Sequence, residues 1–342
     1  MTRTDWACRL ACGLAVIGAF ALAQPALAAA EATPLRITVA VGPAFALGKA
    51  AQRWAELINQ RGGASLGARV FAGATLAQRE PRREFAALRE RGADLGVGSS
   101  LSWSVEVPAL AVASLPWMAP TPRALAALCE GDVARRLSDA VEAKGAHVVA
   151  IAPMTHRAIM TATDRVHTPA DLAGMSVRIP DLPLLSEFYA TLGARPSSMP
   201  SSAARDAAQN GTLEADDATP LAFVSARVDA WGLKYVTVWD AVGELAVFAV
   251  NRAAWEALGP SQRDTVREAA EQAGHELAAN SLQESESALQ TLRERGVTVT
   301  RLLAPAQSVF AASTAAMIAH WTSLIGAELV DAARAAVRDA AR

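Results

Sequence analysis

Short β-rich runs and helix-periodic stretches alternate along most of the chain. Runs that alternate apolar with polar residues predict strands, whereas apolar residues three or four positions apart predict helices. Strands are therefore expected at 35–41, 68–71, 93–98, 147–153, 157–163 and 176–180, with extended segments within 236–250. Helices are expected at 49–59, 79–91, 123–144, 182–192 and 202–209, with a short helix start at 168–171. This alternation favours an α/β fold with parallel sheets covered by helices.

The longest helical pattern lies near the carboxyl end of the chain. Apolar or alanine residues recur at helical spacing through 260–295, and Gly274 is the only breaker within that segment. At about 1.5 Å per residue, such a helix extends roughly 50 Å, which is longer than one small lobe. We therefore expect it to run along both halves of the molecule and to join them.

The first residues have the order of a secretory signal peptide. Arg3 and Arg9 give a basic start, 10–22 is an apolar or small-residue run, and 26–28 offers a small-x-small cleavage site. The apolar run is short for a membrane span. We expect cleavage after Ala28 and a periplasmic location for the mature protein.

Composition narrows the class of protein further. The 342 residues suffice for two domains, and the formal net charge of −2 gives no reason to expect nucleic acid as a partner. Of three cysteines, Cys8 and Cys12 leave with the signal peptide, so Cys129 lacks an intramolecular partner. We interpret Cys129 as a core residue and not as a nucleophile.

The sequence lacks the common signatures of catalysis. Its five histidines form no HExxH motif or His/Cys cluster, and neither a nucleophile elbow nor a Walker loop is present. Gly96 and Gly98 are only a fragment of a dinucleotide-binding motif, and we interpret them as a tight passage of the chain at the lip of a cleft. Asp216 and Asp217 leave an acid–base or metal pair as an alternative, although adjacent strand residues point to opposite faces. We expect no enzyme, no cofactor and no metal.

Two arginines stand apart from the charges on helix faces. Arg157 opens a β-like run, and Arg178 lies within the apolar strand 176–180. A guanidinium in such a place is costly unless it meets an anion or lines a wet cavity. Both arginines are therefore candidate ligand-binding residues, with a structural salt bridge as the alternative for each.

Several segments, taken together, resemble the DctP-type substrate-binding subunits of TRAP transporters (tripartite ATP-independent periplasmic systems). The resemblance covers nearly all of the mature chain, and the order and spacing of its segments make it specific. Its strongest part is 168–180, TPADLAGMSVRIP; the other segments are 71–76, 91–96, 107–110, 115–117, 192–196, 208–217, 234–237 and 251–258.

The resemblance implies a two-lobed periplasmic binding protein fold (type II-like) with crossing strands and a long helix spanning both lobes. We assign 29–150 with part of 235–275 to lobe I, and 151–234 with part of 276–342 to lobe II. Members of the family hold an organic acid between the lobes and deliver it to TRAP membrane subunits. We expect a monomer; a sensing module for a membrane receptor would have the same fold and remains the alternative.

The resemblance also implies residue roles. The family's central arginine matches Arg178, which is expected to hold the ligand carboxylate in a bidentate pair. Arg157 matches a second frequent contact. Asp217 keeps an acid one methylene shorter than the family's usual glutamate. Ser99, Ser100 and Trp103 match a first-lobe segment that often touches the ligand.

Because of two departures from the family pattern, the ligand of a relative cannot be assigned to this chain. Ala218 stands where an amide or indole is usual, and Arg205 aligns near a common aromatic residue. Some relatives place a cation beside the ligand, and Asp217 is the candidate ligand for such an ion.

Overall fold

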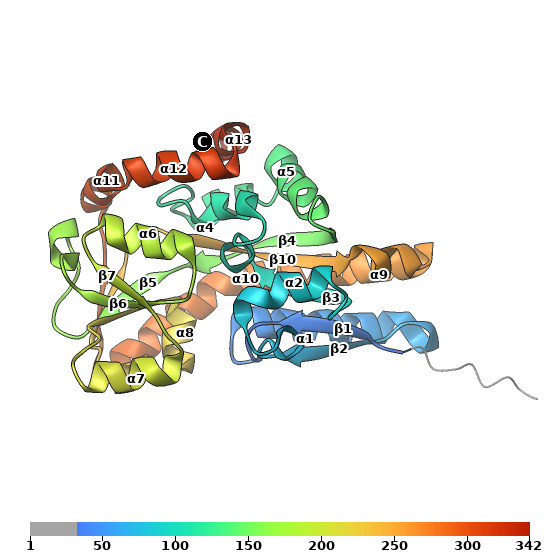
Figure 1. The fold of residues 1–342 in the computed structure, drawn as a ribbon, viewed down its shortest axis with the longest axis horizontal. Coiled ribbons are helices and arrows are strands. Elements are labelled where there is room, and N and C mark those ends of the chain that lie inside the picture. The colour runs from blue at the N-terminus through green and yellow to red at the C-terminus, as the bar shows by residue number, and fades with distance from the viewer. Residues whose placement is uncertain (1–32) are drawn as a thin grey trace, which may run out of the picture. The chain divides into compact units, whose positions relative to one another are not determined.

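The structure is a computed structural model that describes residues 33–342, apart from the Ser201 side chain (Figure 1). The expected signal peptide at 1–28 lies outside these residues. Within them, the strands form a five-stranded sheet of order β2-β1-β3-β10-β4 and a six-stranded sheet of order β11-β9-β5-β8-β6-β7. We call the parts built on these two sheets the first and second lobes.

The first lobe draws its strands from two separate stretches of the chain. They are β1 (Leu35–Val39), β2 (Ala68–Ala72), β3 (Leu95–Ser99), β4 (Ala146–His156) and β10 (Gly243–Asn251). Its helices are α1 (Ala46–Gly62), α2 (Glu84–Arg89), α3 (Ser100–Trp103), α4 (Pro122–Ala127), α5 (Gly131–Glu142) and α9 (Arg252–Ala257). β1 pairs parallel with β2 and β3, whereas β10 pairs antiparallel with β3 and β4. The expectation of parallel sheets is therefore wrong for β10, which returns from the second lobe.

The second lobe has the same mixed character. Its strands are β5 (Ala158–Thr161), β6 (Ser176–Ile179), β7 (Arg195–Ser198), β8 (Ala215–Ala218), β9 (Tyr235–Val238) and β11 (Thr298–Arg301). Its helices are α6 (Pro183–Thr191), α7 (Ser201–Gln209) and α8 (Pro220–Ser225). β6 pairs parallel with β7 and β8, and β5 pairs antiparallel with β8 and β9.

Two chain crossings connect the lobes. β4 leads through Arg157 directly into β5, and β9 leads through 239–242 into β10. The amide of Arg157 donates a hydrogen bond of 2.9 Å to the carbonyl of Val242, so the two crossings lie side by side. The predicted crossing strands are confirmed. The exact division of the chain between lobes stays a prediction.

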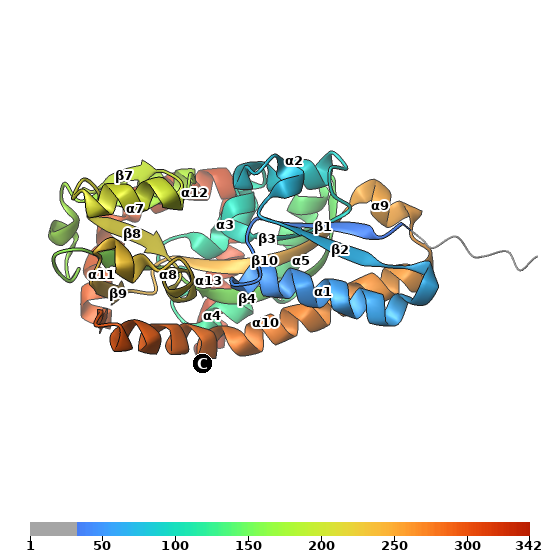
Figure 2. The ribbon, with the colours of Figure 1, turned by 90° about the horizontal axis from the view of Figure 1, so that it is seen from below.

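The long helix is also confirmed. α10 (Pro260–Glu294) has 35 residues and packs against α1 and β4 of the first lobe and against α8 and β11 of the second (Figure 2). The helix continues through Gly274. The Cβ of Ala152 in β4 lies 3.2 Å from where a Cβ of residue 274 would be. A small residue here therefore lets the helix approach β4 closely.

Two predicted helices are shorter than expected for backbone reasons. Gln78 and Arg79 adopt left-handed φ values of 58° and 63°, so the α-helix expected from 79 begins only at Glu84. The helix expected over 123–144 is two helices, α4 and α5, since Gly131 has a φ of 59° at their junction. Helical periodicity continues across both breaks, which is why the pattern alone misses them.

Three helices close the chain: α11 (Ala304–Ser313), α12 (Ala315–Ile325) and α13 (Ala327–Ala340). α13 packs against α4 and α5 of the first lobe, and α12 contacts α6 of the second. Among the described residues, no single helix has the length and hydropathy of a membrane span; α11 and α12 meet that test only as a pair bent by 67°.

An aromatic cluster packs the second lobe against these terminal helices. Trp239, in a crossing segment, lies 5.5 Å from Phe188 and 5.8 Å from Phe310 between ring centroids. Tyr189 joins the cluster 5.9 Å from Trp239 and is fully buried. This packing fixes the direction of the Tyr189 hydroxyl, which reaches the polar residues between the lobes.

Candidate functional site

A cleft of about 300 Å³ opens between the two lobes. It lies where β1, β3, β6 and β8 end, and residues at these ends line it, including Val41, Ser99, Pro180 and Ala218. Ligands of open α/β folds typically bind at the carboxyl ends of strands. Helix α10 closes one side with Ser281, Glu284 and Ser285.

Arg178 reaches this cleft from the middle of β6. Strand register places it directly opposite Asp216 of β8, and its Nη1 lies 3.3 Å from Asp216 Oδ1. Its Nε donates a hydrogen bond of 3.1 Å to the carbonyl of Met199. Its Nη2 makes no hydrogen bond to the residues that the structure describes. The 17% exposed side chain therefore keeps donors available to a molecule in the cleft.

Asp216 is the internal partner of Arg178 but a weak one. Its side chain is 2% exposed, and burial raises the pKa of this carboxyl to about 7 even though Arg178 opposes the shift. Burial disfavours a charged carboxylate, which explains the direction. Near neutral pH a large share of Asp216 is protonated, and the positive charge of Arg178 is then not cancelled.

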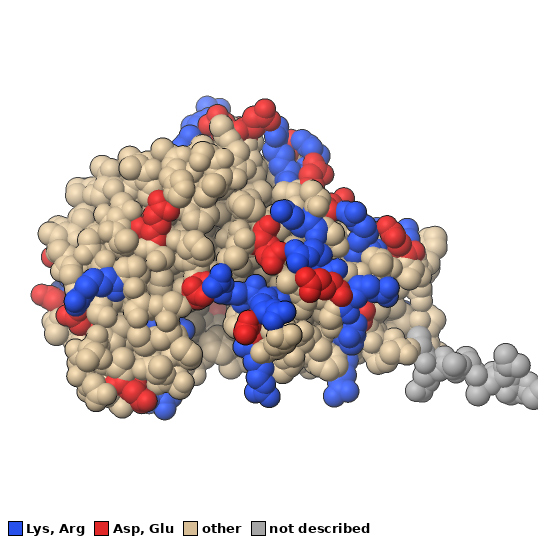
Figure 3. All heavy atoms as spheres, in the orientation of Figure 1, with Lys and Arg blue, Asp and Glu red and all other residues tan. Residues whose placement is uncertain are grey.

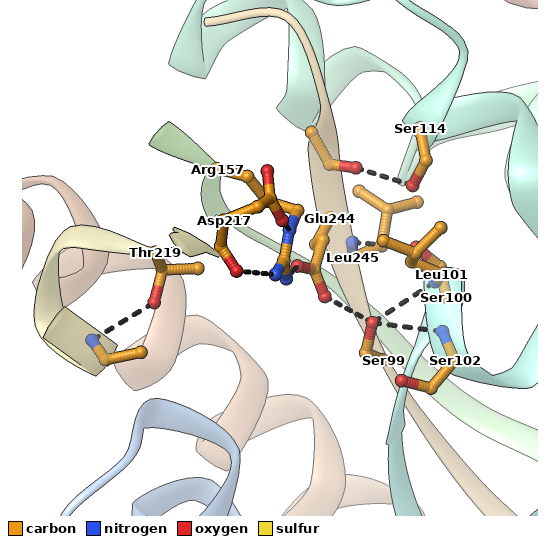
Figure 4. Close-up of polar contacts among 12 residues, drawn as sticks. Ser99, Ser100, Leu101, Ser102, Ser114, Arg157, Asp217, Thr219, Glu244 and Leu245 are labelled. Carbon is orange, nitrogen blue, oxygen red and sulfur yellow. Dashed lines mark hydrogen bonds and ion pairs between the residues drawn. The ribbon is translucent and has the colours of Figure 1, made fainter. Parts of the chain in front are cut away.

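Arg157 has a different environment, because two carboxylates surround it (Figure 4). Its Nε lies 2.5 Å from Asp217 Oδ1, its Nη1 2.6 Å from Glu244 Oε1, and its Nη2 donates a 2.8 Å hydrogen bond to the carbonyl of Asp217. Burial lowers the pKa of Arg157, but Asp217 and Glu244 more than offset this and hold it above its usual value. Arg157 therefore forms the structural salt bridge that was the alternative to ligand binding.

This ion-pair cluster joins the lobes. Asp217 belongs to β8 of the second lobe, whereas Glu244 belongs to β10 of the first. Tyr189 donates a 2.7 Å hydrogen bond to Asp217 Oδ2, and Ser99 donates one to Glu244 Oε2. Both Asp217 oxygens are thus occupied by Arg157 and Tyr189. The described residues contain no group of three His, Cys, Asp or Glu side chains placed to hold a metal ion.

The structure places the other predicted site residues at different depths. Ser99 lines the cleft, but Ser100 is buried, where its hydroxyl accepts a 3.0 Å hydrogen bond from the amide of Leu245. Trp103 is buried and donates a 3.0 Å hydrogen bond from its indole N–H to Glu84. Ser100, Trp103 and Asp217 lie behind the cleft wall, and Arg205 is exposed on α7.

Only glycine fits at position 98, because the Trp103 ring occupies the space that a Cβ would need. A Cβ on residue 98 would lie 1.9 Å from Cε2 and 2.1 Å from Nε1 of the Trp103 indole. The predicted tight passage of the chain at Gly96 and Gly98 is confirmed, but its expected place at the lip of a cleft is wrong, because neither glycine lines the cleft. Every residue of β3 is buried, and its two glycines make room for the Trp103 ring.

Sequence reasoning missed several residues of the cleft wall. Glu244 is the second residue of β10 and precedes the apolar run 245–250. A lone charge in an apolar strand is the signal that singled out Arg178. Phe45 and Trp231 also line the cleft, although nothing in their local sequence distinguishes them from core aromatic residues.

A second hollow, of about 810 Å³, adjoins the cleft and shares Ser102, Arg178 and Pro180 with it. Arg79, Arg82 and Arg83 lie in its wall. Arg82 forms an ion pair with Asp181, which follows β6, so this pair spans the two lobes beside the cleft. Figure 3 shows charges of both signs crowded over the first lobe, whereas the second lobe is mostly uncharged in that view.

Comparison with known proteins identifies this architecture. Residues 38–323 match the family described as bacterial extracellular solute-binding protein, family 7 (DctP). The chain is 25% identical to the C4-dicarboxylate-binding periplasmic protein DctP of Rhodobacter capsulatus, with 95% of this chain and 98% of that protein aligned. A match to a solute-binding protein of Chromohalobacter salexigens is 24% identical and covers 56% of this chain and 57% of that protein.

A solved structure supports the same family assignment. A TRAP periplasmic solute-binding protein of Ralstonia eutropha superposes with a TM-score of 0.85 and 31% identity, covering 90% of this chain and 99% of that one. The two-lobed fold, the cleft and the family match agree, and the family consists of substrate-binding proteins and not of enzymes. The chain belongs to family 7 of the bacterial extracellular solute-binding proteins, the DctP family.

Proposed function

We propose that this protein captures a small organic acid in the cleft and delivers it to the membrane subunits of a TRAP transporter. One observation carries the proposal: Arg178 lines the cleft with an Nη2 that makes no hydrogen bond to any described residue and with only a weak partner in Asp216. A guanidinium is suited to a carboxylate because its N–H groups match the two oxygens.

Relatives support an acid as the ligand. The Ralstonia eutropha protein holds (S)-2-acetolactate, and the Rhodobacter capsulatus relative is named for C4-dicarboxylates. These ligands share a carboxylate and a small size. A cavity of about 300 Å³ is at the lower end of the range of small-molecule sites.

The other predicted site residues take supporting roles in this proposal. Ser99 lines the same cleft as Arg178, and the pair of Arg157 with Asp217 holds the wall in place between the lobes. Ser100 and Trp103 shape the wall from behind. Capture in the periplasm, and action as a monomer, belong to the same proposal.

Thermal unfolding with a panel of monocarboxylates and dicarboxylates tests the proposal. An acid that binds only the folded state raises the melting temperature. We expect at least one acid to do so for the parent chain, and the Arg178→Ala variant to lose most of that shift. If no acid of the panel stabilises the parent chain, acid capture is the wrong function.

A further inference from the structure

We propose that the cleft prefers an acid with one carboxylate on an apolar body over dicarboxylates and sugar acids. This inference rests on the proposed function and specifies its substrate class. It follows from the charges, the apolar side chains and the hydroxyl groups that line the cleft.

The cleft has enough unpaired positive charge to bind one ligand carboxylate. Of the described side chains that line it, Arg157 and Arg178 are the only cations. The Nε, Nη1 and Nη2 of Arg157 already donate hydrogen bonds to Asp217 and Glu244. Only Arg178 therefore remains to pair with a ligand anion.

Acidic side chains also line the cleft. Glu244, which pairs with Arg157, and Glu284, which accepts a 2.7 Å hydrogen bond from Lys49, lie in the wall in addition to Asp216. A second carboxylate on the ligand would meet these acids without a cation of its own. Like charges brought together in a partly desolvated site are strongly unfavourable.

Most of the remaining wall is apolar. More than half of the lining residues have apolar side chains, the larger ones being Phe45, Leu47, Met154, Leu221, Val228 and Trp231. Burying the carbon body of a ligand against them is favourable, because apolar surface leaves water.

Three of the six hydroxyl-bearing side chains that line the cleft already make hydrogen bonds within the protein. Ser99 donates to Glu244, Ser281 donates a 2.7 Å hydrogen bond to the carbonyl of Leu277, and Thr219 accepts from the amide of Ala222. Among the described lining residues, the hydroxyls of Ser102, Thr155 and Ser285 make no side-chain hydrogen bond. A sugar acid brings several hydroxyls, which would outnumber these three groups. Buried hydroxyls without partners oppose binding.

Calorimetry with matched acids tests the preference. Pentanoate and glutarate, and 2-oxopentanoate and 2-oxoglutarate, differ within each pair only by a terminal methyl or carboxylate, and D-glucuronate represents the sugar acids. We expect the monoacid of the better pair to bind about tenfold or more tightly than its diacid. We also expect it to bind more tightly than glucuronate. Equal or tighter binding of the diacid or of glucuronate overturns the preference but leaves acid capture intact. Absence of binding by every acid overturns both.

Glu284→Gln tests the charge argument directly. The substitution removes one carboxylate from the wall and frees the Lys49 ammonium, so diacid affinity should rise by about fivefold or more while monoacid affinity stays within about twofold. Glu286→Gln is the matched control, because Glu286 is on the same helix, pairs with Arg301 and does not line the cleft. An unchanged preference in Glu284→Gln, or an equal change in Glu286→Gln, contradicts the argument.

Discussion

Arg178 and Asp216 lie directly opposite each other on the paired strands β6 and β8, with 3.3 Å between Nη1 and Oδ1. A ligand carboxylate and Asp216 therefore compete for one guanidinium. The protonation state of Asp216 decides how strongly the internal partner competes.

Acid binding should strengthen as the pH falls through about 7, the raised pKa of Asp216. If only the form with protonated Asp216 binds, the affinity rises by about tenfold between pH 8 and pH 6. Calorimetry across this range gives the dependence, and Asp216→Asn should flatten it. The groups around Asp216 that contribute are Arg178, Asp217 and Arg157. A pH-independent affinity of the parent chain contradicts this competition.

The same shift affects stability. The pKa of Asp216 is higher in the folded chain than the value of about 4 expected for the unfolded chain. Between these values the folded state binds more protons, so the contribution of Asp216 to the free energy of unfolding falls as the pH rises from about 4 to about 7. Urea unfolding of the parent chain and of Asp216→Asn at several pH values measures this contribution. If the free energy of unfolding changes with pH in the same way in both proteins, the pKa of Asp216 is not raised in the folded chain.

Arg178→Ala should weaken binding of the cognate acid by about tenfold to two-hundredfold, because a hydrogen bond to a charged group contributes roughly 1.5–3 kcal/mol. Folding should be nearly intact, since Arg178 is at the cleft surface. Titration calorimetry gives the affinity, and the melting temperature without ligand is the control. Wild-type affinity in this variant rejects the assignment. Arg157→Ala should weaken ligand binding less than Arg178→Ala does. An equal or greater loss of affinity would make Arg157 the more important of the two arginines for binding.

Arg157→Ala should instead reduce stability. Its removal leaves Asp217 and Glu244 buried without a countercharge, and breaking such a pair costs about 3–5 kcal/mol of unfolding free energy. Chemical denaturation measures the loss. Arg36→Ala is the control: its partly exposed pair with Asp94 should contribute about 1 kcal/mol or less. Similar losses in both variants would mean that burial of the cluster has no energetic consequence.

The Arg82–Asp181 pair should slow the exit of the ligand. Both side chains are at least half exposed, so Arg82→Ala should change stability by about 1 kcal/mol or less. Because the pair links the lobes beside the cleft, its loss should raise the dissociation rate of the ligand. Stopped-flow dissociation measures the rate, and high salt should reduce the difference between parent and variant. An unchanged rate at low salt refutes a role for the pair in keeping the lobes closed.

Gly98→Ala should destabilise the first lobe. The added methyl group would collide with the buried Trp103 ring, and overpacking of this kind costs typically about 1–3 kcal/mol. Gly42→Ala is the matched control, because no atom of residues 33–342 lies within 4 Å of a Cβ at that position, the neighbouring residues apart. Thermal or urea unfolding compares the two. Equal stabilities would mean that β3 and Trp103 move apart without cost.

The sequence by itself determined the elements that depend on local pattern. Periodic apolar residues predicted α10 to within one residue at its carboxyl end, and β-rich runs predicted β1, β2 and β6. A lone charge in an apolar strand also singled out Arg178. These signals work because helical and strand periodicity, and the cost of a buried charge, are encoded within a few neighbouring residues.

Only the tertiary structure decided which arginine remains available. The partners of Arg157, Asp217 and Glu244, lie 60 and 87 residues away along the chain. Asp217 meets Arg157 because β8 pairs with β5, and Glu244 meets it because β10 returns from the second lobe beside β4. The register of β6 with β8 likewise set Asp216, and not Asp217, opposite Arg178. Strand register and crossings depend on the packing of the whole chain, and the pKa of a carboxyl depends on the burial that this packing creates.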